Sequence, residues 1–295
     1  MLPSYHIGTL DELSRAALAN EEAVTKSSPT RPIFLQSTAW SSAVLTEKTK
    51  VSPDSFIFTF HLDHEYQELG IAVGQHFMMR LRDPSSQKSI IRAYTPISEV
   101  DEKGRLRVLI KVYYATPERP CGRMTQALDS LPLGSSVDFQ GPAGRFKYEG
   151  GGLCVVGEHR HHIRRFVMIC GGSGITPIFQ ILRAIMKDSD DPTECLVLYG
   201  NRTEDDILCR SELDNMAKHN ENRCRLIYSL TRPGDSWGGL KGRFDKSVIS
   251  REVGPPRGPE TGSDMAVICG PEGMEKAAEA ALLGMQWTSK NIVVL

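Results

Sequence analysis

Residues 170–180, which read CGGSGITPIFQ, lie between a buried apolar run and an amphipathic helical pattern. Glycines at 171, 172 and 174 would let the backbone approach a bulky anion, and the helix start would offer unpaired N–H groups and the positive end of its dipole. Pro177 suits the first helical turn, where a missing N–H has no cost. The stretch predicts either an anion-binding turn or a tight strand-to-helix turn without a ligand.

A second candidate lies at residues 92–95, which read RAYT and end a run typical of a strand. On a strand, Arg92 and Tyr94 project to one face and Thr95 to the other. An arginine can bind a phosphate through two hydrogen bonds, a tyrosine can stack on a flat ring, and a threonine can donate a hydrogen bond. Taken alone, the stretch is more typical of an edge strand with a polar tip.

Residues 120–128, PCGRMTQAL, form the third candidate. Gly122 precedes a helical pattern, so Arg123, Met124 and Thr125 would offer backbone N–H groups at a helix start, and Arg123 adds a positive charge. Without other evidence, an ordinary capped helix is the favoured interpretation of this pattern.

Two further candidates follow apolar runs in the second half of the chain. Cys269 begins the stretch CGPEGM at the end of such a run. Ligands of open α/β sheets bind outside the carboxyl ends of the strands. A nucleophilic thiol is one interpretation, but no histidine lies near it in sequence, which favours packing or positioning. Thr231 and Arg232 follow another run, and they would tolerate or attract a ribose 2′-phosphate unless they form an incidental surface loop.

Composition and charge exclude several classes of protein. The 295 residues suffice for two domains, and a net charge of −1 gives no reason to expect bulk nucleic-acid binding. No apolar run approaches the length of a membrane span, and the first twenty residues are too polar for a signal peptide and too acidic for a transit peptide. Seven cysteines without a Cys-x-x-Cys indicate free thiols in a reducing, cytosolic compartment, with neither a disulfide framework nor a metal site.

The hydrophobic periodicity divides the chain into two halves. From about Trp40 to Tyr148, short period-two runs alternate with turn signals, and one helix is expected at 122–131. This pattern predicts a six-stranded antiparallel barrel at 38–150, preceded at 1–37 by a helical stretch and a Ser/Pro-rich linker.

Residues 151–295 are predicted to form an α/β domain. Apolar runs alternate there with helical patterns: strands at 166–170, 195–200, 224–230 and 265–270, and helices at about 177–187, 208–219 and 272–284. Continuous apolar strands alternating with helices indicate a parallel sheet covered on both faces.

Together these motifs resemble the cytochrome b5 reductase family, within the ferredoxin reductase-like flavoproteins. The family's signals Arg-x-Tyr-Thr, Lys-Val-Tyr, Gly-(Lys/Arg)-Met-Thr, Gly-Gly-(Ser/Thr)-Gly-Ile-Thr-Pro and Cys-Gly-Pro occur in order over roughly 38–295. Stretches such as ICGGSGITPIFQILRAIMKD and VGQHFMMRLRD are similar to the flavin-containing C-terminal third of fungal nitrate reductases. MLPSYHIGTLD is similar to the end of the haem domain that precedes it there, so residues 1–37 are expected to be a remnant of that domain and its linker.

The resemblance implies an FAD-dependent oxidoreductase. Hydride would pass from NADPH, or alternatively NADH, to FAD, and single electrons would then pass to a cytochrome b5-type haem domain or protein. Thr95 would lie near flavin N5, and Thr176 between the flavin and nicotinamide rings. Lys111 would help to orient the nicotinamide, and Cys269 would place it. Tyr94 would stack on the flavin, with Arg92 at the FAD phosphates.

The resemblance also implies two sets of cofactor-binding positions. Those for FAD are Arg92, Ala93, Tyr94, Thr95, Leu109, Ile110, Lys111, Val112, Tyr113, Gly122, Arg123, Met124 and Thr125. Those for the pyridine nucleotide are Gly171, Gly172, Ser173, Gly174, Thr176, Thr231, Arg232, Cys269, Gly270, Pro271 and Met274. Arg123 keeps the charge of the lysine that the family usually has there.

Two departures from the family pattern affect the expectation. NADH-preferring members usually carry an acid where Thr231 stands, so Thr231 with Arg232 favours NADPH. Members commonly end in Phe beside the flavin, whereas this chain reads NIVVL at 291–295. The expected protein is cytoplasmic, has no nucleic-acid or membrane partner, and oligomerises, if at all, through domains outside this chain. The alternatives are a free-standing NAD(P)H–cytochrome b5 reductase and a degenerate nucleotide-binding module without turnover.

Overall fold

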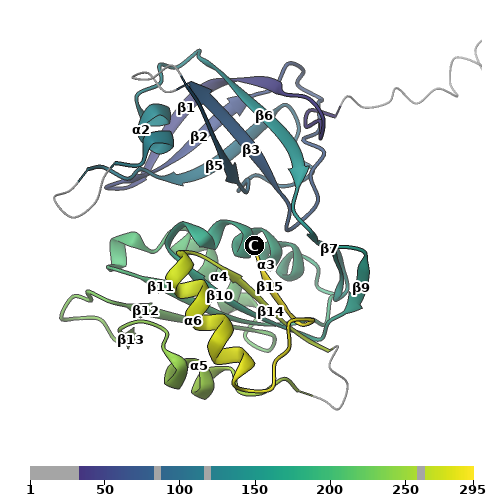
Figure 1. Ribbon diagram of the computed structural model, residues 1–295, viewed down its shortest axis with the longest axis vertical. Helices are drawn as coiled ribbons and strands as arrows, with labels where there is room; N and C mark the ends of the chain where they lie inside the picture. The colour runs from purple at the N-terminus through teal and green to yellow at the C-terminus, as the bar shows by residue number, and fades with distance from the viewer. Residues whose placement is uncertain (1–32, 83–87, 116–120, 258–262) are drawn as a thin grey trace, which may run out of the picture. The chain divides into compact units, whose positions relative to one another are not determined.

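Residues 33–150 contain a six-stranded sheet in which every neighbouring pair is antiparallel, as predicted. The computed structural model describes residues 33–82, 88–115, 121–257 and 263–295, so the haem-domain remnant expected before residue 33 lies outside the described residues. The strand order is β4-β3-β6-β1-β2-β5 (Figure 1). The strands are β1 (Ser41–Ser52), β2 (Ser55–His61), β3 (His76–Arg82), β4 (Ser89–Tyr94), β5 (Arg105–Lys111) and β6 (Ser136–Ala143).

Aromatic side chains fill the inside of this barrel. Phe58 and Phe60 alternate along β2 and are fully buried, as is Phe77 of β3. The Phe139 ring of β6 lies with its centroid 5.1 Å from that of Phe60 and 5.4 Å from that of Phe77, both edge to face. Each such burial stabilises the fold by about 1.5–3 kcal/mol, so the period-two pattern determines which side of each strand faces inward.

The segment that follows β4 returns to the opposite edge of the sheet. The Ile97 N–H donates a hydrogen bond of 2.9 Å to the carbonyl of Arg107 on β5. Because β4 and β5 are the two edge strands, this contact curls the sheet and brings the end of β4 close to β5.

The barrel begins earlier than the expected start near Trp40. Phe34 and Leu35 are each 2% exposed and belong to the barrel core, and their N–H groups donate to the carbonyls of Glu68 and Leu69. A short apolar Ile-Phe-Leu run after prolines looked like linker in sequence. This run is part of the barrel because its side chains cover one side of the aromatic core.

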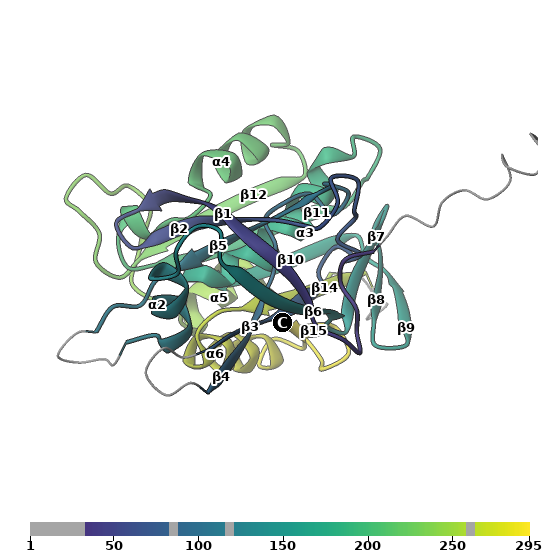
Figure 2. The ribbon, with the colours of Figure 1, turned by 90° about the horizontal axis from the view of Figure 1, so that it is seen from above.

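A three-stranded antiparallel sheet lies beside the α/β half, and none of its strands is predicted by the sequence analysis (Figures 1 and 2). It consists of β7 (Phe146–Gly150), β8 (Leu153–Val156) and β9 (His159–His162), and it crosses the boundary expected at residue 150. The polar sequence HRHH gives β9 no apolar alternation, and its residues are exposed or half-buried. Backbone pairing with β8 holds this strand in place.

The second half contains a six-stranded sheet whose neighbouring strands are all parallel, in the order β13-β12-β11-β10-β14-β15. Its strands are β10 (Arg165–Gly171), β11 (Glu194–Asn201), β12 (Cys224–Leu230), β13 (Leu240–Lys241), β14 (Asp264–Cys269) and β15 (Ile292–Val294). The four predicted strands are confirmed to within a residue at each end. The short edge strands β13 and β15 were not predicted, since two or three residues show no periodicity.

Helices cover both faces of the parallel sheet, as predicted. One face packs against α3 (Ile175–Lys187) and α4 (Arg210–His219), and the other against α5 (Lys246–Glu252) and α6 (Glu272–Leu283). The helix α5 was not predicted, although Asp245 caps it by accepting a hydrogen bond from the Val248 N–H. Within the described ranges, no helix is long and apolar enough to cross a membrane.

The C-terminal end of α3 is held by one arginine. The guanidinium of Arg223 donates to the carbonyls of Ile185 at 3.1 Å and Met186 at 3.2 Å, and also to those of Asp188 and Asp191. A positive charge suits the negative end of the helix dipole, and the last carbonyls of a helix have no partner within it. Arg223 therefore fixes α3 to the start of β12.

We expect Arg223→Ala to lower the free energy of unfolding by about 2 kcal/mol, because several carbonyls lose a charged donor. The matched control is Arg225→Ala, which should cost less than about 1 kcal/mol, because the Arg225 side chain is 64% exposed in its pair with Glu252. Urea unfolding of both variants measures the difference. Equal costs for the two variants would contradict the role of Arg223.

Candidate functional site

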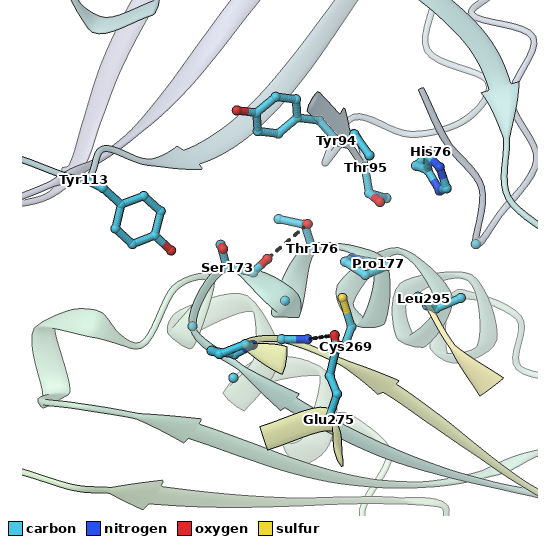
Figure 3. Close-up of a pocket in the computed structure, with 17 residues that line it drawn as sticks. His76, Tyr94, Thr95, Tyr113, Ser173, Thr176, Pro177, Cys269, Glu275 and Leu295 are labelled. Carbon is cyan, nitrogen blue, oxygen red and sulfur yellow. Dashed lines mark hydrogen bonds between the residues drawn. The ribbon is translucent and has the colours of Figure 1, made fainter. Parts of the chain in front are cut away.

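A pocket of about 530 Å³ is lined by residues of both halves (Figure 3). From the barrel come Gly74, His76, Ala93, Tyr94, Thr95 and Tyr113. From the α/β half come Gly171, Gly172, Ser173, Gly174, Thr176, Pro177, Cys269, Gly270, Pro271, Glu275 and Leu295. Three motifs that lie far apart in the sequence, RAYT, GGSGITP and CGP, thus meet at one place.

The barrel side of the pocket is formed by the end of β4. Tyr94 is half-buried, and burial raises the pKa of its hydroxyl to about 12, so the ring stays neutral. Thr95 is 8% exposed and lies across the pocket from Thr176 (Figure 3). Arg92 does not line the pocket: it is exposed and donates to the Ile91 carbonyl at 2.7 Å. It is still near enough to the Tyr94 hydroxyl to oppose the rise in its pKa.

The glycine turn forms the opposite side, between β10 and α3. A one-turn 3-10 helix η1 (Gly172–Gly174) precedes α3, which starts at Ile175, two residues earlier than predicted. Pro177 lies in the first turn of α3, as expected. A Cβ on Gly174 would lie 2.6 Å from the carbonyl carbon of Cys269, so only glycine lets β14 approach the helix start this closely. The Thr176 hydroxyl donates to the Ser173 carbonyl at 3.2 Å (Figure 3).

Cys269 ends β14 and pairs in register with Cys170 of β10. Burial raises the pKa of the Cys269 thiol to about 12, which disfavours a nucleophilic thiolate. The next residue, Gly270, donates its N–H to the Glu275 carboxylate at 2.8 Å, so the turn after β14 is braced from α6. Met274 does not line the pocket. It packs beneath the turn, where a Cβ on Gly171 would lie 2.8 Å from its sulfur.

Lys111 is not among the pocket residues, although it was expected to help orient the nicotinamide. Its ammonium group binds Asp54 at 2.8 Å and Asp206 at 2.5 Å, and its side chain is only 12% exposed. Burial acts to lower the pKa of Lys111, but the hydrogen bonds with Asp206 and Asp54 raise it overall. Asp206 ends η2 (Glu204–Asp206) and caps it by accepting from the backbone and side chain of Thr203. Lys111 thus ties the barrel to the α/β half.

The other positions expected around the flavin separate into two groups. Tyr113 lines the pocket, whereas Leu109, Ile110 and Val112 are buried with their side chains in the protein interior. Leu109 packs in the core of the α/β half and Ile110 in the barrel core.

The segment from Gly122 lies directly behind Tyr113. It starts α2 (Arg123–Asp129), with Gly122 at the N-cap position and Met124 buried, while Arg123 is exposed. The Thr125 hydroxyl oxygen accepts from the Tyr113 N–H and donates to the Gly122 carbonyl, both at 3.1 Å. These residues adjoin the pocket without lining it.

Thr231 and Arg232 are exposed at the carboxyl end of β12, as expected, and they do not line the pocket. Their N–H groups donate to the carbonyls of Asn201 at 3.0 Å and Arg202 at 2.7 Å. Arg202 therefore lies at the same rim, after β11, and the sequence analysis did not consider it. The pairing of two loops from neighbouring strands could not be inferred from the sequence of either loop.

Sequence reasoning also missed His76 and Glu275. His76 starts β3, and burial lowers the pKa of its ring, which favours the neutral form. No motif marked it, because a single histidine in GQHF has no characteristic spacing to a partner. Leu295, at the end of the NIVVL stretch in which the sequence departs from the pattern that the resemblance implies, also lines the pocket.

The fold and the site together define a two-domain flavoprotein oxidoreductase. Residues 42–148 match the model of the oxidoreductase FAD-binding domain, and residues 168–280 match that of the oxidoreductase NAD-binding domain. The cytochrome b5 reductase domain of Ulva prolifera nitrate reductase superposes with a TM-score of 0.83 at 32% identity, covering 89% of this chain and 100% of that domain. The chain belongs to this family of reductase domains and is an NAD(P)H-dependent flavoprotein reductase.

Two curated relatives are longer than this chain. It is 50% identical over 293 residues to an NADPH nitrate reductase of Fusarium oxysporum, covering 99% of this chain and 32% of the relative. It is 51% identical over 302 residues to an NADPH nitrate reductase of Neurospora crassa, covering 100% of this chain and 30% of the relative. The chain thus spans about a third of the length of these relatives.

Proposed function

We propose that this chain is the reductase part of an NADPH-dependent nitrate-reducing enzyme, and that the cofactors meet in the pocket between Thr95 and Thr176. The observation that carries the proposal is the convergence of RAYT, GGSGITP and CGP on one pocket. Hydride transfer between two ring systems needs them stacked face to face, and a pocket built from both halves provides a wall for each.

The barrel wall fits a flavin. Tyr94 and Tyr113 present aromatic rings at the pocket, and Ala93 and Gly74 line it with little bulk. Arg92 and Arg123, both exposed beside this wall, would neutralise the FAD phosphates. Lys111, held by two carboxylates, would act by fixing the barrel to the α/β half rather than by touching the nicotinamide.

The α/β wall fits a pyridine nucleotide. The turn from Gly171 to Gly174 and the start of α3 would receive the pyrophosphate, because backbone N–H groups at a helix start attract anions. Cys269, with a neutral thiol, would place the nicotinamide ring. Thr231 and Arg232, together with Arg202, would bind the 2′-phosphate that distinguishes NADPH from NADH.

FAD, when bound, accepts a hydride from the nicotinamide and releases its electrons one at a time. The residues of the pocket would contribute alignment of the two rings and exclusion of water, and none of them is needed as a strong acid or base. We infer that the electrons leave to a cytochrome b5-type haem domain or protein, and that the enzyme works in a reducing, cytosolic compartment. All seven cysteines are free thiols, which supports the second inference.

The purified chain is expected to be yellow with bound FAD and to reduce ferricyanide with NADPH, but not to reduce nitrate by itself. Absorbance spectra and steady-state assays with each acceptor measure this. A chain that binds NADPH but cannot be loaded with FAD would instead be a nucleotide-binding module. Nitrate reduction by this chain alone would contradict the proposal that the chain is only the reductase part of the enzyme.

A further inference from the structure

One stripe of α3 faces the barrel along the whole length of the helix. Thr176, Gln180, Arg183 and Lys187 are spaced by four, three and four residues, which places them on one helical face. Thr176 lines the pocket, and the Gln180 side-chain oxygen accepts a hydrogen bond of 2.6 Å from the Gly74 N–H of the barrel. Lys187 lies 3.7 Å from the Glu99 carboxylate. The helix that carries Thr176 is therefore also the helix that docks on the barrel.

Arg183 makes the strongest set of these contacts. Its Nη1 and Nη2 donate to the carbonyls of Ile97 at 2.7 Å and Ser98 at 2.8 Å, and its Nε lies 3.2 Å from the Glu99 carboxylate. Its side chain is 19% exposed. A planar guanidinium presents its donors in a rigid fork that fits two successive carbonyls, whereas the three donors of an ammonium group sit on one freely rotating nitrogen.

The segment that Arg183 binds carries the barrel wall of the pocket. Thr95 precedes Ile97 by two residues, and all residues from Thr95 to Ser98 are buried. The Ser98 hydroxyl oxygen also accepts from the Arg107 N–H at 3.3 Å, so the segment is fixed to β5 as well. The backbone between Thr95 and the two carbonyls that Arg183 binds therefore has little freedom to move.

We propose that Arg183 is a positioning residue for hydride transfer: by binding Ile97 and Ser98, it sets the separation between Thr95 and Thr176, and so between the two cofactor rings. The inference rests on the proposed function of the pocket. Arg183 follows Thr176 by seven residues, about 10.5 Å along the same helix. Because this helix is rigid, the contacts of Arg183 with the barrel also determine the position of Thr176 in the pocket. A shift of about 1 Å in reacting atoms can slow a reaction by about a hundredfold.

The test uses the full chain loaded with FAD and compares Arg183→Met, Arg183→Lys and the control Lys187→Met. Lys187 lies on the same stripe and faces the same carboxylate, but its side chain is 64% exposed and binds no carbonyl. In anaerobic stopped-flow experiments, Arg183→Met is expected to lower the limiting rate of flavin reduction by NADPH about 10- to 100-fold, with the Kd for NADPH changed less than about threefold. Arg183→Lys should fall between Arg183→Met and the parent, and Lys187→Met should match the parent.

Two further readouts separate positioning from general stability. The long-wavelength absorbance that stacked flavin and nicotinamide rings give should weaken in Arg183→Met and persist in Lys187→Met. In the protein without FAD, amide hydrogen exchange at Thr95, Ile97 and Ser98 should accelerate in Arg183→Met only, because the carbonyls of Ile97 and Ser98 are released.

The outcomes distinguish this inference from the function on which it rests. If NADPH does not reduce the flavin of the parent chain, the proposed function is overturned. A normal parent together with an Arg183→Met rate within twofold of it overturns only the positioning role. Loss of FAD from Arg183→Met would assign the residue to flavin retention and overturn the positioning role too. If Arg183→Met does not fold, Arg183→Lys provides the test. A parental rate of flavin reduction and a parental absorbance band in Arg183→Lys would overturn the positioning role.

Discussion

Gly174→Ala is expected to lower kcat/KM for NADPH-dependent ferricyanide reduction about a hundredfold while FAD stays bound, since misplacing reacting groups by about 1 Å can have this effect. The added methyl group would lie 2.6 Å from the carbonyl carbon of Cys269 and 2.8 Å from the Cα of Gly270. Both are backbone atoms, so no side chain can rotate away. The end of β14 has to move away from the start of α3.

This movement should change the pyridine-nucleotide wall of the pocket and leave the flavin wall unchanged. The end of β14 carries Cys269, and the start of α3 carries Thr176, so separating the two elements widens the pocket on that side only. The backbone at Gly174 has φ −64°, which alanine adopts without strain, so the effect arises from the close approach alone.

Gly273→Ala is the matched control. Gly273 lies in α6, next to the same turn, and a Cβ there meets no atom within 4 Å. Alanine should raise helix stability by up to about 1 kcal/mol without changing kinetics. Steady-state kinetics and the flavin-to-protein absorbance ratio measure both variants. Parental kcat/KM in Gly174→Ala would show that β14 and α3 can separate without disturbing the pocket.

The parts of the site that could be predicted from sequence are those fixed by local structure. The turn at 171–177 follows from glycines between a buried strand and an amphipathic helix. The place of Cys269 follows from the rule that the carboxyl ends of parallel strands share one edge. In both cases the neighbours that determine the geometry lie on elements whose type could be identified from periodicity.

The parts that could not be predicted depend on partners distant in sequence. Lys111 binds Asp54 and Asp206, which are 57 and 95 residues away, and no pattern within the KVY stretch indicates that either carboxylate will be there. Arg183 similarly finds the carbonyls of Ile97 and Ser98, which any residue type would present. Such contacts are determined by how the barrel and the α/β half meet, and a carbonyl acceptor leaves no trace in the sequence.

Thr231→Asp is expected to lower the ratio of kcat/KM for NADPH to that for NADH about a hundredfold, which corresponds to about 2.7 kcal/mol. An aspartate at this rim would repel a 2′-phosphate, and it would accept a hydrogen bond from a free ribose 2′-hydroxyl. Both effects shift the ratio in the same direction. The backbone should tolerate the change, because Thr231 is exposed and only its N–H is bound, to the Asn201 carbonyl.

Ser236→Asp tests whether position or charge alone matters. Ser236 is exposed and lies five residues after Thr231 on the same loop, so Ser236→Asp adds the same charge at another position. The NADPH to NADH ratio of this variant should stay within about threefold of the parent, because an exposed charge without direct contact to the ribose is weakened by water and salt. Raising the salt concentration should shrink any effect of Ser236→Asp but leave most of the Thr231→Asp effect, since the latter arises from direct contact with the ribose. Equal shifts in the two variants would refute the placement of the 2′-phosphate between Thr231, Arg232 and Arg202.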